Sequence, residues 1–196
     1  MSAEIDLLIV DVGWPPETFI QRKLVSLARK GLRIAVVSSS PSRQARQFSL
    51  PGVKLVRLPH HDDNVLLRVL QVPPTVLRTA ASPGGLNKLT FLWRYTTKES
   101  PRAWLNRLLS AAVLMRLKPE IVHFEWNSAA INYGELSKIW DCPFVISCRG
   151  RQINVRPHVP GNGDYVNSLR QTLERAAAVH CVSDAIKQEA IKLGLD

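Results

Sequence analysis

The chain has 196 residues, of which 45% are hydrophobic and 21% charged; this is enough for one sizeable domain with a single core, and it excludes a disordered chain. No apolar run approaches the roughly 18 residues that span a bilayer, and the N-terminus lacks a basic signal-peptide region, so we expect a cytoplasmic protein. The formal charge of +10 predicts an anionic partner, which nucleic acid, a membrane surface or a phosphorylated small molecule would each satisfy.

Six short apolar runs, rich in β-branched residues, alternate with helical patterns along the chain. Runs without polar alternation are typical of strands that are buried on both faces of a parallel sheet. Their order predicts an α/β fold with a doubly wound, mostly parallel, Rossmann-like sheet, formed by a single domain over residues 1–196. The expected strands are Ile5–Val10, Arg33–Ser38, Val53–Leu58, Glu120–Phe124, Phe144–Cys148 and Ala178–Val182.

Helix signals lie at both ends of the chain. Apolar residues from Phe19 to Ala28 recur at helical spacing, and Gly31 follows where a left-handed cap is expected. Near the C-terminus, Ser183 is a suitable N-cap for an apolar stripe that stops at Gly194. These signals predict a βαβ unit at the start of the chain and a helix at its end.

A basic, helical insertion is expected at about residues 62–118, with interruptions at Pro73-Pro74, at Ser82–Gly85 and at Ser100-Pro101. Between Val65 and Lys118 the only acid is Glu99, against nine basic residues: Arg68, Arg78, Lys88, Arg94, Lys98, Arg102, Arg107, Arg116 and Lys118.

Aromatic residues interleave with basic ones in the second half of this insertion, a pattern that suits an anionic lipid surface. The residues expected to contact such a membrane are Lys88, Trp93, Arg94, Arg102, Trp104 and Arg107. Alternatively, the helices pack their aromatic side chains into the core and leave a solvated basic face. The pattern alone does not separate the two arrangements.

Cofactor and metal signals are weak. The three cysteines, Cys142, Cys148 and Cys181, lack the spacing of metal ligands, and we expect them to be buried free thiols. The loop after the first strand has no G-x-G-x-x-G, and two prolines in it remove backbone donors. We therefore expect neither a metal ion nor a nicotinamide or flavin cofactor.

Ligands of doubly wound sheets bind beyond the carboxyl ends of the strands. The loops to inspect are therefore 11–17, 125–128, 149–154 and 183–184. Glu125 and Arg149 lie at such strand ends, and they are candidates either for contacts with substrate or for a structural ion pair. His123 and His180 are expected to be core histidines with satisfied hydrogen bonds.

Four segments in this order resemble the N-terminal domain of glycosyltransferase family 4, over nearly the whole chain. They are Pro16-Glu17-Thr18-Phe19-Ile20; Pro119-Glu120-Ile121-Val122-His123; Val145 to Ile153, which is similar to a strand ending in "H-G-x-D"; and Ala177 to Ser183 with the later Leu193-Gly194. The resemblance implies the N-terminal half of a two-domain GT-B fold.

The resemblance further implies sugar transfer, with retention, from a nucleotide-sugar donor to a saccharide or lipid-linked acceptor in the synthesis of a surface polysaccharide or glycolipid. The C-terminal domain that would bind the donor is absent, so this chain alone is expected to be inactive and to supply the acceptor side. Two family positions differ, because Arg149 replaces the histidine and Gln152 the aspartate of "H-G-x-D". Many members also have another histidine where Glu125 stands.

Within that frame we expect Arg149 to stabilise the departing diphosphate and Glu125 to bind a sugar hydroxyl, to help remove an acceptor proton or to pair with Arg149. The residues expected to bind the acceptor are Glu17, Thr18, Trp126, Asn127, Gly150, Arg151, Gln152 and Ser183.

Two alternatives involve no catalysis. In the first, the basic stretch binds phosphates of nucleic acid; no helix-turn-helix, zinc-ligand or RNA-binding signature supports it, and no nucleic-acid partner is expected. In the second, the domain binds an anionic lipid or a protein partner and leaves its strand-end loops without a chemical role.

Overall fold

A computed structural model describes residues 5–40, 48–59, 65–96 and 101–195. Six parallel strands form one sheet in the order β3-β2-β1-β4-β5-β6. This is the strand order of the doubly wound, Rossmann-like fold, and it confirms the predicted fold class.

The strands follow the apolar runs closely. They are β1 (Ile5–Ile9), β2 (Ile34–Ser38), β3 (Val53–Arg57), β4 (Pro119–Phe124), β5 (Phe144–Cys148) and β6 (Ala178–Cys181). Each predicted boundary is correct to within one residue. Every residue of β2 is buried, whereas the two edge strands, β3 and β6, are only partly covered. A continuous apolar run therefore predicts a strand both inside this sheet and at its edges, but it predicts full burial only for a strand in the interior.

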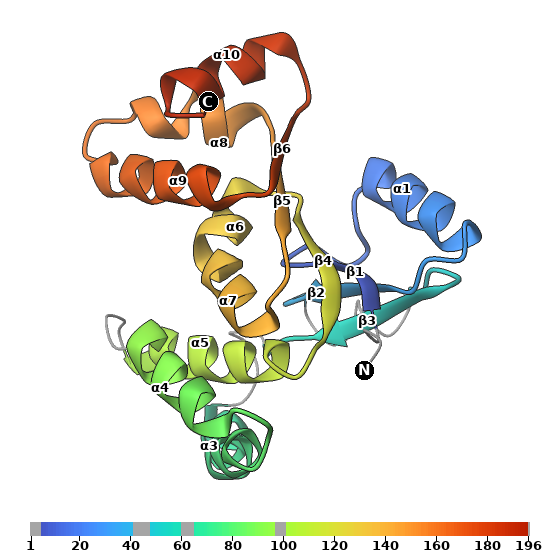
Figure 1. Ribbon diagram of the computed structural model, residues 1–196, viewed down its shortest axis with the longest axis vertical. Helices are drawn as coiled ribbons and strands as arrows, with labels where there is room; N and C mark the ends of the chain where they lie inside the picture. The colour runs from blue at the N-terminus through green and yellow to red at the C-terminus, as the bar shows by residue number, and fades with distance from the viewer. Residues whose placement is uncertain (1–4, 41–47, 60–64, 97–100, 196) are drawn as a thin grey trace.

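Helices cover both faces of the sheet (Figure 1). Helix α1 (Thr18–Arg29) lies on one face, where Ile20 and Leu24 pack against side chains of β1 and β2. Most other helices lie on the opposite face, over a larger core that includes Leu8 and Phe124. The connections that follow β1 and β4 thus leave the sheet toward opposite faces.

Helix α1 ends as its sequence predicts. Gly31 has a φ of 87°, and its N–H donates to the Ala28 carbonyl at 3.0 Å. The next N–H, of Leu32, donates to the Leu27 carbonyl at 3.4 Å. These two bonds form a Schellman motif, which needs a left-handed residue that glycine adopts without strain.

Three helices form the connection between β3 and β4: α3 (Val65–Ala80), α4 (Gly85–Thr96) and α5 (Pro101–Leu114). Figure 1 shows them as a group at one end of the molecule, with α5 nearest the sheet. The expected interruption at Pro73-Pro74 is wrong, because α3 runs through both prolines. Each proline removes one hydrogen bond inside the helix, but the carbonyls left without a donor belong to the exposed residues Val69 and Leu70.

The rest of the chain forms α6 (Asn127–Tyr133), a short 3-10 turn (Gly134–Leu136), α7 (Ser137–Trp140), α8 (Gly150–Asn154), a second 3-10 turn (Arg156–His158), α9 (Gly163–Arg175) and α10 (Asp184–Lys192). Ser183 caps α10 as predicted, since its hydroxyl accepts a hydrogen bond from the Ile186 N–H at 3.3 Å. Within the described ranges, no helix has the length and hydropathy needed to cross a membrane.

Candidate functional site

The candidate site lies at the carboxyl ends of the central strands. β1 and β4 are neighbours, and the helices that follow them, α1 and α6, cover opposite faces of the sheet (Figure 1). A doubly wound sheet opens a crevice at this kind of switch point. Three charged side chains meet there: Lys23 from α1, Glu125 directly after β4 and Arg149 directly after β5.

Glu125 is the centre of this cluster. Its side chain is 0% exposed, and its two carboxylate oxygens pair separately, Oε1 with the Lys23 ammonium and Oε2 with a terminal nitrogen of Arg149 at 3.1 Å. A buried carboxylate is stable only when it is paired in this way. The two cations remain 30% and 22% exposed, so the cluster buries one negative charge and presents two positive charges to solvent.

Burial also lowers the pKa values of the two cations. Burial, with the nearby Arg149 charge as a second cause, lowers the pKa of Lys23 to about 8. Burial likewise lowers the pKa of Arg149, while Glu17 acts in the opposite direction. Desolvated cations bind an anion more strongly than hydrated ones, because less water must be removed.

The Arg149 guanidinium is held on two sides. Its carbon lies 4.4 Å from the centre of the Phe19 ring on α1, and a terminal nitrogen bonds Glu125. Its Nε is buried and makes no hydrogen bond among the described residues. The group is therefore fixed in orientation, and because its side chain is 22% exposed, its remaining terminal N–H groups keep donor capacity for a further partner.

A chain of hydrogen bonds runs from this cluster across three strands. Lys23 Nζ lies 3.4 Å from His123 Nδ1, His123 Nε2 lies 2.9 Å from Ser147 Oγ, and that oxygen lies 3.3 Å from His180 Nδ1. Because an ammonium only donates, Nδ1 of His123 accepts, its Nε2–H donates to Ser147, and the serine hydroxyl donates to His180. These donor and acceptor roles assign to His123 the neutral tautomer that carries its proton on Nε2.

The two histidines differ in their surroundings. His123 is largely buried, and burial together with the Lys23 charge lowers its pKa to about 3. It is neutral near pH 7 and fully hydrogen-bonded, which confirms the expectation of a satisfied core histidine. His180 is exposed, so the same expectation is wrong for that residue; its place on the edge strand β6 leaves it uncovered.

Gln152 does not point freely into the crevice. Its side-chain oxygen accepts from the Ser128 N–H at 3.0 Å, and its nitrogen donates to the Ser128 hydroxyl at 3.0 Å. This reciprocal pair joins α8 to α6. The neighbouring Asn127 is buried, and its amide finds no oxygen or nitrogen partner in the described parts of the chain, although it interacts with the Cys148 thiol and opposes the raised pKa of that group. Trp126 is half-buried immediately before α6.

The other residues expected to bind an acceptor lie at helix starts around the crevice. Glu17 and Thr18 are exposed at the beginning of α1, and Gly150 and Arg151 are exposed at the beginning of α8. Ser183 is exposed at the beginning of α10, but its hydroxyl is already used by the helix cap. The structure therefore gathers the expected residues at one edge of the sheet and commits Ser183 and Gln152 to structural bonds.

A pocket of about 460 Å³ opens beside this edge, between α8 and the start of α9. Arg156 lines it and stacks on the Tyr165 ring at 4.1 Å, and the Tyr165 hydroxyl donates to the Gln152 carbonyl at 2.9 Å. The pocket combines two guanidinium groups with apolar and amide side chains, which suits a polar ligand with anionic or hydroxyl groups. Its lining residues are Arg151, Gln152, Val155, Arg156, Val159 and Asn162.

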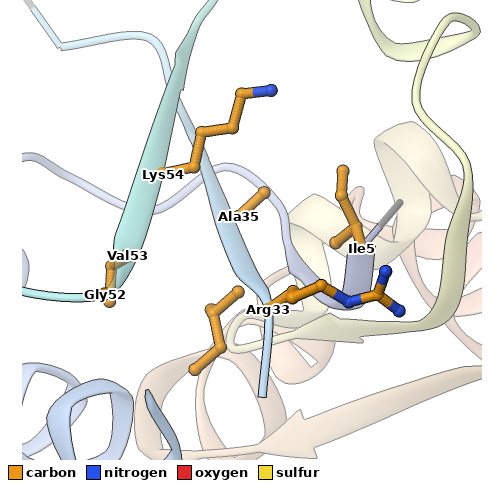
Figure 2. Close-up of a pocket in the computed structure, with 7 residues that line it drawn as sticks. Ile5, Arg33, Ala35, Gly52, Val53 and Lys54 are labelled. Atoms are coloured by element: carbon orange, nitrogen blue, oxygen red, sulfur yellow. The ribbon is translucent and has the colours of Figure 1, made fainter. Parts of the chain in front are cut away.

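A second pocket, of about 390 Å³, lies at the opposite edge of the sheet. Figure 2 shows it at the amino ends of β1, β2 and β3, with Arg33 and Lys54 beside small and apolar residues. The Arg33 guanidinium pairs with Asp6. Since ligands of this fold bind at the carboxyl edge, this pocket is not the candidate site.

Three contacts at the site were not predicted from the sequence. Lys23 lies 102 positions before Glu125 in the chain, on a helix whose polar residues give no sign of which one faces the sheet. Phe19, counted among the apolar residues at helical spacing, is 40% exposed and its ring lies under the Arg149 guanidinium. The Gln152–Ser128 pair joins the starts of two helices, α8 and α6.

Two of the three free cysteines, Cys148 and Cys181, lie at the carboxyl ends of β5 and β6, whereas Cys142 precedes the amino end of β5. Cys148 and Cys181 are register partners on β5 and β6, and burial raises the pKa of the Cys148 thiol to about 12. Cys148 is buried, whereas Cys142 and Cys181 are half-buried. The expectation of free thiols agrees with this arrangement, and only one of the three is fully buried.

A comparison with curated proteins finds no match. A comparison with protein families matches residues 16–196 to the glycosyl transferase 4-like domain. The match begins at the loop before α1 and includes every strand from β2 onward, together with the crevice residues from α1, β4 and β5. The fold, the position of the crevice and this match agree, and the chain belongs to the glycosyl transferase 4-like family.

Proposed function

We propose that this domain forms the acceptor side of a sugar-transfer cleft, in which a nucleotide-activated sugar is the donor. The observation on which the proposal depends is the meeting of Lys23 and Arg149 over the buried Glu125 at the switch point of the sheet. Transfer from such a donor leaves a negatively charged diphosphate. Two partly desolvated cations at the crevice would stabilise that charge as it develops.

Arg149 is the residue that we assign to the diphosphate. Its guanidinium is oriented by Phe19 and Glu125, and its buried Nε makes no hydrogen bond among the described residues. A planar group with several fixed donors matches the geometry of phosphate oxygens. The donor's nucleotide would be held by a second domain, as the resemblance to the family implies, and retention of configuration is part of the same expectation.

Glu125 acts in this proposal as a positioning residue and not as the proton acceptor. Its carboxylate is 0% exposed, and both oxygens are paired. An acceptor hydroxyl would have to displace a cation to reach it, which is unfavourable for a buried charge. Of the roles expected from the sequence, pairing with Arg149 is therefore the one that we propose.

The pocket beside α8 is our proposed acceptor site. Arg151 and Arg156 line it, and Arg151 is only two positions beyond Arg149, so an acceptor bound there would lie next to the diphosphate-binding cation. A saccharide, free or lipid-linked, offers the hydroxyl groups that such a pocket can bind.

The test is sugar transfer by the full-length protein with Arg149→Ala. We expect turnover to fall by about 100-fold to 1000-fold, as when a fixed donor to a developing anion is removed. Arg149→Lys should restore only part of the activity, because a lysine lacks the planar fork. The control is Arg22→Ala, which removes an exposed arginine of α1 and should leave turnover unchanged. Unchanged turnover in Arg149→Ala would contradict the proposal and favour a non-catalytic binding module.

A further inference from the structure

Helices α3 and α4 expose large apolar side chains to an unusual degree. Among the described residues, the five most exposed large hydrophobic side chains all belong to this helix pair. Leu86 is 80% exposed, Leu77 69% and Trp93 68%, and Leu66 and Leu70 follow. Contiguous exposed apolar surface on a soluble domain marks an interaction site.

The exposed residues of α3 form one stripe. Leu66, Val69, Leu70, Pro73 and Leu77 are spaced by three or four positions, which places them on one face of the helix. The opposite face of α3 is already used, since Val72 packs against the core and Thr79 is buried. Helix α3 therefore has two apolar faces, of which one is packed and the other is open.

Helix α4 repeats this arrangement. Leu86 and Trp93 lie seven positions apart, about two turns, on its exposed side. Leu92 is 2% exposed, and Leu89 packs beside it on the core. The two exposed faces belong to neighbouring helices that pack against one another.

The charge of this helix pair has a single sign. Residues 65–96 include four basic residues, Arg68, Arg78, Lys88 and Arg94, and no aspartate or glutamate. Arg78 and Arg94 have exposed side chains, and Lys88 is half-buried, with its ammonium 3.3 Å from the Ser82 hydroxyl. An apolar surface flanked by positive charge is complementary to a partner that offers both negative charge and an apolar interior.

The helix pair is also well placed for such a contact. In Figure 1, which has the longest axis of the molecule vertical, α3 and α4 lie at one end and α9 and α10 at the other. The carboxyl ends of β5 and β6 lead into α8 and α10, toward the end opposite α3 and α4 (Figure 1).

We propose that the exposed faces of α3 and α4 dock the domain on the surface of an anionic lipid bilayer. The leucines and Trp93 would enter the boundary between headgroups and acyl chains, and the exposed Arg78 and Arg94 would face the anionic headgroups. A second copy of the chain is a poorer occupant, because a symmetric contact would bring these basic residues against one another.

This surface differs from the set of residues expected from the sequence. Trp93 and Arg94 belong to it, whereas Trp104 is half-buried on α5 and packs against the core. Arg107 stacks on the Tyr95 ring at 4.4 Å and reaches the Asn132 carbonyl at 3.5 Å. The side chain of Arg102 lies outside the described residues.

The first experiment is sedimentation of the chain with vesicles of phosphatidylglycerol and phosphatidylcholine, with pure phosphatidylcholine vesicles as a comparison. We expect binding to the anionic vesicles. The double variant Leu77→Ser with Leu86→Ser should bind at least about tenfold more weakly, because two leucines lose their apolar transfer. The matched control is Val182→Ser with Ile191→Ser, two exposed apolar residues at other places on the surface, and it should bind as the parent chain does.

A charge variant tests whether the basic residues contribute to binding of the anionic headgroups. Arg78→Gln should weaken binding to anionic vesicles by about fivefold, the effect of one basic residue near such a surface. Arg22→Gln, an exposed arginine on α1, is the control and should have no effect. Binding of the parent chain should also weaken as salt is added.

Tryptophan fluorescence gives a readout that does not depend on sedimentation. Trp93 is 68% exposed, whereas Trp14 and Trp140 are buried, so a blue shift on addition of anionic vesicles should disappear in Trp93→Phe. Equal binding by the leucine variant and its control, or no binding by the parent chain, would overturn the proposal. A dimer of the parent chain that the leucine variant abolishes would also overturn it, by assigning the surface to a second copy.

Discussion

The crevice at β4 and β5 and the helix pair α3–α4 depart from the usual burial pattern in opposite ways. At the crevice, a carboxylate is fully buried with two cations over it; on the helix pair, leucines and a tryptophan are exposed. Buried charge and exposed apolar surface each cost stability unless a partner is present. The difference indicates that the crevice is suited to a polar, charged ligand and the helix pair to an apolar one.

The largest expected effect on stability is that of Glu125→Ala. Removal of the carboxylate leaves Lys23 and Arg149 facing each other without a counter-charge, and we expect the free energy of unfolding to fall by about 3 to 5 kcal/mol. Urea denaturation measures this change. A double-mutant cycle with Lys23→Ala should recover part of the loss. A loss below about 1 kcal/mol would show that the buried ion cluster is not a structural unit.

A contrast within α4 should give the next largest effect. Leu92 is 2% exposed and Leu86 is 80% exposed on the same helix. Leu92→Ala should therefore lower the free energy of unfolding by about 2 to 4 kcal/mol, and Leu86→Ala by less than about 0.5 kcal/mol. Thermal and urea unfolding of the two variants test this directly. Similar losses in both would mean that the outer face of the helix is packed, contrary to the proposed docking surface.

The burial of His123 predicts that the stability of the domain depends on pH. The pKa of His123 is about 3 in the folded chain and about 6.5 in an unfolded one, so between these values the unfolded chain binds the extra proton. Stability should fall as the pH drops from about 6.5 toward 3, with a slope from this group of at most about 1.4 kcal/mol per pH unit.

In the variant His123→Asn, the free energy of unfolding should fall less steeply than in the parent chain as the pH drops from 7 to 4. Urea denaturation at a series of pH values measures this slope. His158→Gln is the control, because the His158 side chain is 57% exposed and its ion pair with Glu189 lies at the surface; the dependence of its stability on pH should stay close to that of the parent chain. An unchanged slope in His123→Asn would place the acid sensitivity in other groups.

The smallest changes in the free energy of unfolding are expected for a hydrogen-bonded side chain beside the crevice and for an exposed arginine of α3. Gln152→Ala removes the two hydrogen bonds to Ser128 that join α8 to α6, and we expect a loss of about 1 kcal/mol. Arg78→Gln on the exposed side of α3 should change stability by less than about 0.5 kcal/mol. Denaturation of both variants in parallel would show whether the crevice is the more rigid of the two regions.

The strands were predictable because parallel strands buried on both faces have continuous apolar runs, such as Phe144–Cys148, that no other element of this length shares. The pairing of Glu125 with Arg149 was foreseen as one alternative, because both residues follow neighbouring strands. Lys23 was not foreseen, since its contact depends on how α1 is seated on the sheet. That seating is tertiary information without a local pattern.

The helix connection was less predictable for a different reason. Two consecutive prolines are a strong local signal for a break, yet α3 runs through Pro73 and Pro74. An amphipathic pattern is expected to bury its apolar face, but α3 has apolar residues on two faces and can bury only one of them. Which face is packed depends on the position of α5 and the sheet, and the sequence pattern does not specify it.

The connection between β3 and β4 has a consequence for how such domains can diversify. Helices α3 and α4 make their main contacts with one another and with α5, and strand pairing does not involve them. Substitution, lengthening or replacement of their outer faces would leave the register of the six strands unchanged. The outer faces of this connection can therefore vary in sequence while the residues at the strand ends stay in place.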